Sequence, residues 1–343
     1  MSRVPKSAPR SQIAVIGAGI AGLACARILV DGGHAVTVFD KGRRPGGRVA
    51  TRRDGPFSFD HGAQYFTIEN DVLPAPIANA VDEVVIAPWD GRIVSMSGGR
   101  RESVEDTRRR WVGIPGMSAL PQHMSAGLDV RCGRAISGVT RNSAGWRLRF
   151  EDGSEAGRAD IVVVAVPAPQ AAALLADSPN LSNRATATTM APCWAVMLGF
   201  EQPLNVPYDG AFVADSPVGW IARDRSKPGR GGGDSWVVHA SPEWSRKYLE
   251  AERREIVEEL RDAFGQVIGQ AVSKPAYAKA HRWRFARVEV PAGDACLFDT
   301  ELGIGACSDW CVGGKIESAL ASGQALGERI IHSRTPALAP ERA

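Results

Sequence analysis

Apolar residues near the start of the chain change their spacing in a way that predicts a strand, a helix and a second strand. Residues 13–16 are a continuous apolar run, which is typical of a parallel strand buried on both faces. From Ile20 to Ile28 the apolar side chains recur at the spacing of one helical face, and Gly32-Gly33 favours the end of that helix. Residues 35–39 then read as a second strand. The pattern predicts a β-α-β unit of a parallel sheet, with a right-handed crossover.

Later apolar runs predict further strands, without a sequence repeat. Residues 146–150 alternate between apolar and polar side chains, and Glu151-Asp152-Gly153 favours a hairpin turn. Residues 161–166 are again continuously apolar, and Pro167 is expected to end that strand. Another candidate strand covers residues 235–239.

The segment around that last strand predicts a loop and one helix. Ser241 followed by Pro242 is typical of an N-cap and a first helical position. Ile256, Leu260 and Phe264 mark the buried face of the same helix. The glycine-rich residues 229–233, which precede the strand, are predicted to form a mobile loop tip.

Length and composition place these elements in an ordinary globular protein. With 343 residues, 44% of them hydrophobic and 23% charged, the chain is expected to form two domains. A net charge of +3 argues against nucleic acid as the main partner, and no run of 18 apolar residues predicts a membrane span. Residues 1–12, which lack the apolar stretch of a signal peptide, and residues 334–343 are expected to be flexible tails.

The six cysteines show no spacing typical of a zinc site. We therefore expect no metal centre, reduced thiols and a cytoplasmic protein.

Residues 17–22, between the first strand and its helix, carry the G-x-G-x-x-G pattern as Gly17-Ala18-Gly19-Ile20-Ala21-Gly22. The first glycine permits a tight turn, the second lets the backbone approach a pyrophosphate, and the third lets the helix pack against the strand. The helix start offers N–H groups to phosphates. Asp40, 18 residues after Gly22, is placed to accept hydrogen bonds from ribose hydroxyls. This combination predicts a dinucleotide site, and leaves little support for a glycine turn kept for packing alone.

Further segments bear on which dinucleotide is bound. Residues 43–48 add Gly46-Gly47 and guanidinium groups close behind Asp40. Residues 60–66 form an extended segment that contains a glycine. Residues 305–320 read as another strand, glycine turn and helix start, with Asp309 in the turn.

Taken in order, these segments resemble the flavin amine oxidase superfamily. The resemblance is carried by the G-x-G-x-x-G pattern and its acid, Gly46-Gly47-Arg48, Asp60-x-Gly62-Ala63-Gln64-Tyr65, residues 159–167, and the C-terminal turn with Asp309. Within the superfamily the chain is most similar to the bacterial renalases. The segments similar to that subgroup are residues 110–118, 220–228, 236–245, 281–283 and 308–311.

The resemblance implies an α/β fold with a Rossmann-type three-layer FAD-binding domain and a discontinuous second domain built on a mixed β-sheet plus helices. Residues 13–75, 111–170 and 292–333 would form the FAD-binding domain. Residues 76–110 and 171–291 would form the substrate domain.

The resemblance also implies a non-covalent FAD and a set of residues that hold it. Arg48 would lie at the pyrophosphate, Gln64 near the flavin ring, Asp309 at the ribityl chain and Ile316 at the helix end that faces the pyrimidine. The other residues expected to bind the cofactor are Gly17, Ala18, Gly19, Ile20, Ala21, Gly22, Asp40, Lys41, Gly47, Gly62, Ala63 and Ile136. One position departs from the family, because Ser308 stands where a glycine is usual before the acid. We expect its Cβ to crowd the phosphate approach.

The activity that the resemblance implies is oxidation of aberrant 2- or 6-dihydro isomers of NAD(P), which carry a hydride at the wrong ring carbon. The hydride would pass to flavin N5, O2 would be reduced to H2O2, and oxidised NAD(P) would leave. Hydride transfer depends on positioning more than on acid–base groups. The expected partners are therefore this dinucleotide and O2, and the protein is expected to be a monomer or a homodimer.

Four side chains are expected to line the substrate cavity: Tyr65, Trp220, His239 and Trp283. Arg223 and Arg225 are candidates for binding the substrate's phosphates. Each residue also has a purely structural interpretation, as a core histidine, a core or domain-interface aromatic residue, or part of a solvated charged stretch. Cys307 and Cys311 are interpreted as buried thiols, and not as sites of covalent flavin attachment.

The sequence leaves rival functions open. A flavin amine oxidase acting on a small amine shares the fold and would use a lysine-held water, for which Lys274 or Lys279 are candidates. A non-catalytic flavin-binding protein is the second rival. An NAD-linked dehydrogenase is disfavoured, because it has no use for the Asp309 element. The preferred isomer, the choice between NAD and NADP and the physiological electron acceptor are not determined by the sequence.

Overall fold

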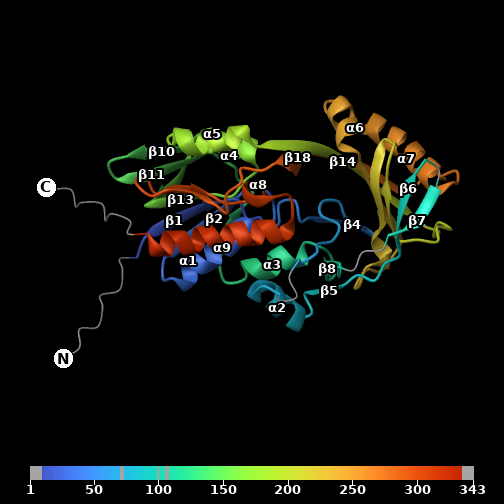
Figure 1. The fold of residues 1–343 in the computed structure, drawn as a ribbon, viewed down its shortest axis with the longest axis horizontal. Coiled ribbons are helices and arrows are strands. Elements are labelled where there is room, and N and C mark those ends of the chain that lie inside the picture. Colours follow the sequence, from blue (N-terminus) through green and yellow to red (C-terminus); the bar gives the residue numbers. More distant parts are fainter. Residues whose placement is uncertain (1–9, 70–72, 99, 105–107, 334–343) are drawn as a thin grey trace. The chain divides into compact units, whose positions relative to one another are not determined.

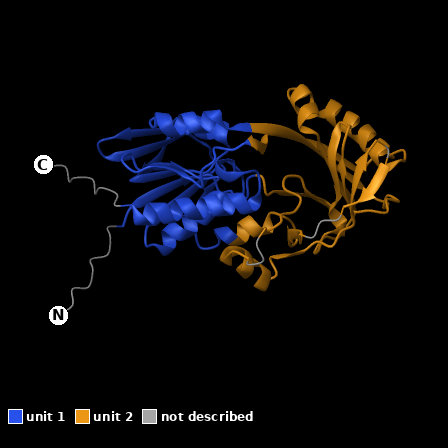
Figure 2. Cartoon of the chain, viewed as in Figure 1, with its two compact units in different colours: residues 1–47, 124–189, 290–343 blue, residues 48–123, 190–289 orange. Residues whose placement is uncertain are grey.

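The structure, a computed structural model, describes residues 10–69, 73–98, 100–104 and 108–333. The chain forms two compact units, shown in Figure 2. Unit 1 comprises residues 1–47, 124–189 and 290–343, and unit 2 comprises residues 48–123 and 190–289. The predicted tail 334–343 lies outside the described residues, as do residues 1–9, whereas Gln12 already belongs to the first strand.

The units and the predicted domains differ in four segments. Residues 48–75 and 111–123, which the prediction gave to the FAD-binding domain, cluster with unit 2. Residues 171–189 and 290–291, which it gave to the substrate domain, cluster with unit 1. Hydrogen bonds tie residues 171–189 to unit 1, because Ser178 Oγ donates to Asp299 over 2.8 Å and Arg184 donates to Ala292 O and Asp294.

A six-stranded sheet forms the centre of unit 1, in the order β19-β20-β13-β1-β2-β9. Its strands are β1 (Gln12–Ile16), β2 (Ala35–Asp40), β9 (Asp129–Cys132), β13 (Ile161–Val164), β19 (Leu297–Asp299) and β20 (Ile304–Ala306). All neighbours are parallel except β19 and β20. The predicted apolar strands at residues 13–16 and 161–164 are buried throughout, although the second ends two residues before its predicted limit of 166.

Helices and a small sheet enclose this central sheet as two outer layers (Figure 1). On one face lie α1 (Ile20–Asp31) and α9 (Ile316–His332), which contact each other closely. A Cβ added at Gly323 of α9 would lie 2.1 Å from the Ala21 carbonyl oxygen, so only glycine permits this approach. The other layer contains α4 (Ala168–Leu174), α5 (Pro179–Ala187) and the sheet β10 (Ile136–Asn142), β11 (Gly145–Phe150) and β12 (Glu155–Ala159). The predicted three-layer Rossmann-type fold and the predicted β-α-β unit are confirmed.

Unit 2 is built on a seven-stranded sheet in the order β18-β14-β17-β16-β15-β6-β7. Its strands are β6 (Ile93–Ser97), β7 (Arg100–Ser103), β14 (Thr189–Phe200), β15 (Gly210–Val213), β16 (Val218–Arg223), β17 (Asp234–Ala240) and β18 (Tyr277–Val290). β6 and β15 are parallel, whereas β14, β15, β16 and β17 pair antiparallel with their neighbours among these four strands. The predicted mixed sheet is therefore confirmed.

The two faces of this sheet bury different side chains. On one face, Trp236 and Val238 of β17 share a core with Ile256, Leu260 and Phe264 of α7 (Arg253–Ile268), which lies against the sheet in Figure 1. Val237, on the opposite face, is in a cluster with aromatic residues of the hairpin β3 (Thr51–Asp54) and β4 (Phe57–Asp60). The alternation of side chains along β17 thus turns His239 toward the hairpin side of the sheet.

The single helix predicted from residue 242 onward is instead two helices, α6 (Pro242–Lys247) and α7. The predicted N-cap is confirmed, since Ser241 Oγ accepts a hydrogen bond from Trp244 N over 3.2 Å. The helix breaks because carbonyl oxygens in the turn have partners elsewhere: Tyr248 O accepts from Trp194 Nε1, and Leu249 O accepts from Arg282.

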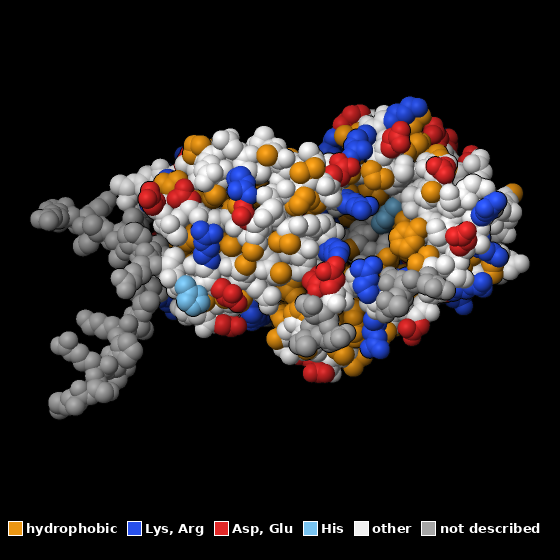
Figure 3. Space-filling model, viewed as in Figure 1, with side chains coloured by type: hydrophobic (Ala, Val, Ile, Leu, Met, Phe, Trp, Pro, Cys, Tyr) orange, Lys and Arg blue, Asp and Glu red, His pale blue; other side chains and the backbone are white. Residues whose placement is uncertain are grey.

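The remaining elements are short. They are α2 (Ala75–Asp82), β5 (Ile86–Pro88), β8 (Trp111–Gly113), α3 (Ala119–Ser125), the 3-10 turn η1 (Asp224–Ser226) and α8 (Asp309–Val312). In the described part of the chain, no helix is both long enough and apolar enough to span a membrane. Acidic and basic side chains are interspersed over the face shown in Figure 3, in keeping with the small net charge.

Candidate functional site

Two of the three glycines in the G-x-G-x-x-G turn are required by contacts inside unit 1. Gly17 has φ of +112°, and a Cβ there would lie 2.5 Å from the Ala165 carbonyl oxygen. A Cβ at Gly22 would lie 1.9 Å from the Gly17 carbonyl oxygen. These positions carry the tight turn and the helix–strand contact that the motif predicts.

Gly19 is different, because the protein itself does not require a glycine there. Its φ is −78°, and a Cβ would meet no described atom within 4 Å. It is the N-cap of α1 and makes no side-chain cap, so the helix start presents its first N–H groups without a capping side chain. Gly46 N donates to Ala18 O over 2.9 Å, which brings Gly47 beside Gly19. The glycine-lined backbone at residues 17–22 and 46–47 fits the phosphates of a dinucleotide.

Asp40, at the end of β2, holds this turn through its carboxylate. Oδ2 accepts from Ala18 N over 2.7 Å and Oδ1 accepts from Gly42 N over 2.6 Å. Burial raises the pKa of Asp40, against the effect of both backbone bonds and of Lys41. Each carboxylate oxygen keeps a second lone pair for the ribose hydroxyl predicted from the sequence.

The C-terminal turn places its acid at the start of α8. Asp309 is buried and accepts from Ser308 Oγ over 2.8 Å. Ser308 has φ of −176°, an extended conformation that any residue adopts, so the backbone itself does not need the glycine usual in the family. Ile316 is the first residue of α9, as the sequence predicts for a helix end, and Ile136 is the first residue of β10.

The two cysteines of this turn are poor nucleophiles. Cys307 and Cys311 are both buried, and burial raises the pKa of Cys311 to about 12. The pKa of Cys307 is also raised, by its neighbour Cys25 and by burial. Thiolate formation is therefore suppressed at neutral pH, in line with the predicted unreactive thiols.

In unit 2, Arg48 and the segment after β4 lie side by side. Ala63 N donates to Arg48 O over 2.9 Å, and a Cβ at Gly62 would lie 1.9 Å from that same oxygen. The Arg48 guanidinium donates to Ala286 O over 3.2 Å. The predicted cofactor-binding residues Arg48, Gly62 and Ala63 are thus neighbours, and the glycine is needed for the contact.

Gln64 belongs to a buried ionic network that was not predicted from the sequence. Asp60, Asp224 and Lys227 are almost completely buried, and Lys227 Nζ donates to Asp60 over 3.2 Å, to Asp224 over 2.6 Å and to Gln64 Oε1 over 3.1 Å. Arg230 adds a second cation, 2.5 Å from Asp60 Oδ2. The spacing that signals the network is Asp224-x-x-Lys227-x-x-Arg230, three charged residues at intervals of three that meet around Asp60.

Burial and neighbouring charges have opposing effects on the pKa values of the two aspartates in this network. Burial raises the pKa of Asp60, but the charges of Lys227 and Arg230 outweigh this and lower it below the ordinary value. Burial and the charge of Asp60 raise the pKa of Asp224 to about 6. Asp60 N also donates to Asp224, so the network fixes the backbone that leads into His61.

Three histidines and a tryptophan form what we call the histidine group: His61, His239, His281 and Trp283. The rings of His61 and His281 are stacked, with centroids 4.9 Å apart and planes 5° apart. Trp283 contacts both rings edge-on, at 5.4 Å from His61 and 4.2 Å from His281. The His61 carbonyl oxygen accepts from Trp283 Nε1 over 2.9 Å and lies 3.2 Å from His239 Nε2.

The histidine group is uncharged at neutral pH. Burial lowers the pKa of His61 to about 3 and the pKa values of His239 and His281 to about 4. Nearby Arg52 adds to this effect for His61 and His281. Since His239 Nε2 faces a carbonyl oxygen, it carries the proton, and Nδ1 is left as the acceptor.

All four predicted cavity residues lie in or beside the histidine group. Trp220 is paired directly with His239 across β16 and β17, which puts both side chains on one face of the sheet. Tyr65 lies against Trp220, with ring centroids 5.8 Å apart. His61 and His281 were missed, although His281 is two residues before Trp283 on β18 and so on the same face.

The arginines predicted to bind substrate phosphates have different surroundings. Arg223 Nε lies 2.9 Å from Asp234 Oδ1, its guanidinium donates to the Leu204 and Val206 carbonyl oxygens, and it covers the Trp236 ring at 4.7 Å. These partners give Arg223 a structural role in place of the predicted contact with the substrate's phosphates. Arg225 is exposed in η1.

The lysines considered for an amine oxidase are both exposed. Lys279 Nζ lies 3.4 Å from Asp54 and Lys274 precedes β18. Across the ranges that the structure describes, no cluster of three or more His, Cys, Asp or Glu residues could hold a metal ion.

Comparison with known proteins shows two family matches along the chain. An NAD(P)-binding Rossmann-like domain matches residues 15–74, and the flavin containing amine oxidoreductase family matches residues 94–294, which is more than half of the chain. A 4,4'-diapophytoene desaturase of Staphylococcus haemolyticus is 48% identical over 50 residues, which are 15% of this chain and 10% of that enzyme. The same enzyme of Staphylococcus aureus (strain Newman) is 47% identical over 51 residues, again 15% and 10%. The matched part is thus a small fraction of these curated relatives.

Solved structures share the fold at low identity. A protein assigned as a protoporphyrinogen oxidase, from Exiguobacterium sp. 255-15, has a TM-score of 0.76 at 15% identity, over 95% of this chain and 99% of its own. Cyclohexylamine oxidase from Brevibacterium oxydans IH-35A has a TM-score of 0.72 at 13% identity, over 94% and 99%. Wild-type putrescine oxidase bound to putrescine has a TM-score of 0.68 at 14% identity, over 94% and 99%. The Rossmann turn that fits dinucleotide phosphates and the family match lead to one conclusion: the chain belongs to the flavin containing amine oxidoreductases, and its cofactor is FAD.

Proposed function

We propose that the protein is a renalase-like oxidase of 2- or 6-dihydro isomers of NAD(P), and that the histidine group binds the nicotinamide ring. The observation that carries the proposal is the uncharged character of His61, His239 and His281 beside Trp283. FAD, when bound, would accept the hydride and pass two electrons to O2 to give H2O2.

The charge change of the reaction explains why neutral rings suit it. A dihydronicotinamide ring is uncharged, and the oxidised ring that leaves carries one positive charge. Protonated histidines would repel that product, whereas neutral imidazole and indole rings offer polarisable faces to both forms. Trp220 and Tyr65 extend the same aromatic surface.

The pKa values also fit a reaction that needs no proton donor from the protein. Histidines with pKa values of about 3 to 4 hold almost no proton at pH 7 and are poor general acids. His239 Nδ1 and the rings beside it would instead orient the carboxamide and the ring plane, which is the main requirement for hydride transfer.

A flavin amine oxidase remains the second candidate, because the family match and two of the structural neighbours, cyclohexylamine oxidase and putrescine oxidase, point to amines. The exposure of Lys274 and Lys279 argues against the lysine-held water that the sequence analysis considered for that reaction.

Anaerobic stopped-flow mixing tests the proposal. We expect FAD-loaded protein to bleach rapidly with 2- or 6-dihydro NAD(P), and to release one H2O2 per substrate once air is admitted. Putrescine, cyclohexylamine and ordinary 4-dihydro NADH serve as controls and should bleach it far more slowly. Rapid bleaching by the amines alone would establish the amine oxidase, and a flavin that stays oxidised with every reagent would indicate a non-catalytic protein.

A further inference from the structure

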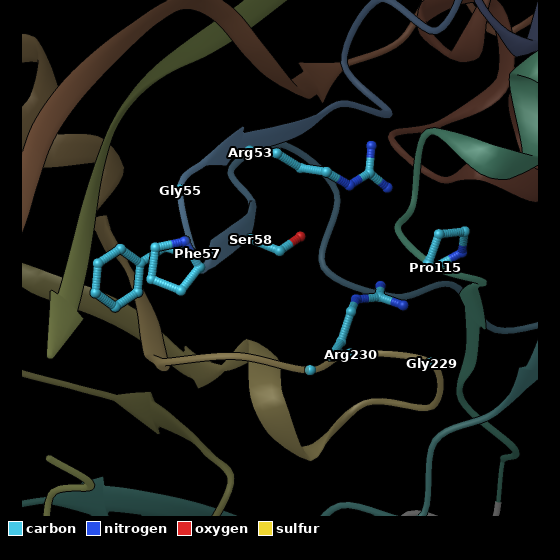
Figure 4. A pocket seen from close by; sticks show the side chains of 9 residues that line it. Arg53, Gly55, Phe57, Ser58, Pro115, Gly229 and Arg230 are labelled. Atoms are coloured by element: carbon cyan, nitrogen blue, oxygen red, sulfur yellow. The ribbon is translucent and has the colours of Figure 1, made fainter. Parts of the chain in front are cut away.

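A pocket in unit 2, of about 190 Å³, lies apart from the histidine group's rings and has no role in the function proposed above. Its walls come from the β3–β4 hairpin, from Pro115 and from the glycine-rich loop (Figure 4). The lining residues used below are Arg53, Ser58, Pro115, Gly229 and Arg230.

The glycine-rich loop at residues 229–233 is packed onto the hairpin, and differs in this from the predicted mobile loop tip. A Cβ at Gly232 would lie 2.0 Å from the Pro56 carbonyl oxygen, and one at Gly233 would lie 2.2 Å from the Phe57 ring. Gly233 N also donates to Pro56 O over 3.1 Å. Glycines at these positions therefore let two backbone segments meet and form the pocket wall.

Two buried donors in this pocket have no hydrogen-bond partner among the described residues. They are Ser58 Oγ and Arg230 Nε. The other nitrogens of Arg230 are occupied: Nη1 donates to Gly113 O over 2.6 Å and Nη2 to Asp60 over 2.5 Å. Because an unsatisfied buried donor is costly, two of them on one pocket indicate an acceptor ligand.

The arginine that completes the pocket is Arg53. It is paired with Ser58 across β3 and β4, so both side chains are on the same side of the hairpin. In Figure 4 the Ser58 hydroxyl points into the space between the side chains of Arg53 and Arg230.

The charges around the pocket sum to a positive value. Arg53, Lys227 and Arg230 contribute three positive charges, while Asp60 and Asp224 contribute at most two negative ones. The net charge is therefore about +1. Burial raises the pKa of Asp224 to about 6, so this carboxylate becomes protonated in mild acid and the net charge of the pocket's surroundings increases. Asp54 and Arg52 are on the opposite side of the hairpin, where Asp54 faces Lys279.

We propose that this pocket binds an oxyanion of the phosphate class, held by Arg53, Ser58 Oγ and Arg230 Nε. Donors that converge from two strands and a loop suit a tetrahedral phosphate, whose several oxygens accept in different directions. A planar carboxylate would satisfy one guanidinium fork and leave the other donors unmatched. The site is new with respect to the flavin chemistry and does not depend on which substrate is oxidised.

Isothermal titration of the FAD-loaded protein with inorganic phosphate and with pyrophosphate, at constant ionic strength, tests the site. We expect saturable binding that weakens about tenfold in Arg53→Gln and about threefold to tenfold in Ser58→Ala, from the loss of one charge-assisted or one neutral hydrogen bond. Arg254→Gln is the matched control, because it removes the same charge from an exposed position on α7 outside the pocket and should leave affinity unchanged.

Three results would overturn the proposal. They are the absence of saturable binding by either anion, an equal loss in Arg254→Gln and Arg53→Gln, and competition by acetate as strong as by phosphate. Arg53 is exposed and Ser58 Oγ donates to no described group, so both variants should fold, and thermal melting verifies this. Bleaching by dihydro-NAD(P) in Arg53→Gln reports separately on the proposed oxidase activity, so the two proposals can fail independently.

Discussion

The dinucleotide turn of unit 1 lies within one stretch of sequence, from Gly17 to Gly22, whereas the histidine group of unit 2 is gathered from residues 61, 239 and 281–283. In the turn, local backbone geometry does the work: a positive φ, two close approaches and an uncapped helix start. In the histidine group, the packing of buried rings and the charge network around Asp60 determine where the side chains lie. The first kind of site depends on single atoms of the backbone, and the second on long-range packing and electrostatics.

The largest expected effect comes from breaking the charge network that supports the histidine group. In Asp60→Asn, Lys227 and Arg230 lose a buried anion, which should lower the free energy of unfolding by about 3–5 kcal/mol. Chemical denaturation of the FAD-free protein measures this. Asp54→Asn, at an exposed position of the same hairpin, is the control and should cost less than about 1 kcal/mol. A small loss in Asp60→Asn would show that unit 2 does not rely on this network.

Two glycine variants divide the roles inside the dinucleotide turn. In Gly22→Ala the new Cβ collides with the Gly17 carbonyl oxygen, so we expect both stability and FAD affinity to fall, the latter by about a hundredfold or about 2.7 kcal/mol. In Gly19→Ala the new Cβ meets no atom of the described residues within 4 Å, so the FAD-free protein should keep its stability while FAD affinity still falls about tenfold. Melting without FAD and flavin-fluorescence titration measure the two effects. Unchanged FAD affinity in Gly19→Ala would mean that phosphate does not approach this residue.

The same contrast explains what the sequence could predict. The β-α-β unit and the structural roles of Gly17 and Gly22 were predicted correctly, because a strand, a turn and a helix are encoded by neighbouring residues. The division of the helix after Lys247 was not, because it depends on hydrogen bonds from the distant Trp194 and Arg282.

Side-chain partners in unit 2 were the hardest to predict. Arg223 was predicted to contact the substrate because its partner Asp234 cannot be identified from the sequence. The two residues become neighbours only when β16 pairs with β17. His61 was overlooked beside Asp60 because nothing in its local sequence shows that His281 stacks on it. Burial of a polar residue is a property of the assembled sheet and cannot be read from one segment.

The pH dependence of stability tests the burial of the histidine group. A histidine with its pKa lowered to about 3 in the folded protein takes up a proton more readily when unfolded, where its pKa is about 6.5. Its contribution is therefore complete above pH 6.5 and is lost as the pH falls toward 3. For His61, which is 6% exposed, we expect a loss of about 2 kcal/mol between pH 7 and pH 4.5.

His61→Phe isolates this contribution, since phenylalanine keeps a ring beside His281 and cannot titrate. Denaturation of both proteins at several pH values should give similar stabilities at pH 8 and an advantage for the variant that grows below pH 6.5. Asp224, whose pKa is raised to about 6, has the opposite pH dependence in both proteins and cancels in the comparison. Parallel curves would show that His61 is not buried as a neutral ring.

The smallest expected effect concerns one hydrogen bond within the histidine group. Trp283→Phe keeps an aromatic ring on β18 but removes the Nε1 donor to the His61 carbonyl oxygen, a bond of 2.9 Å. His239 Nε2 still faces that oxygen, so the carbonyl is not left without a donor and stability should fall by only about 1 kcal/mol. If the group binds the nicotinamide ring, KM for dihydro-NAD(P) should rise severalfold while FAD affinity is unchanged. An unchanged KM together with the small stability loss would mean that Trp283 only holds the backbone of His61. Binding of the nicotinamide ring would then be left to His239 and its neighbours.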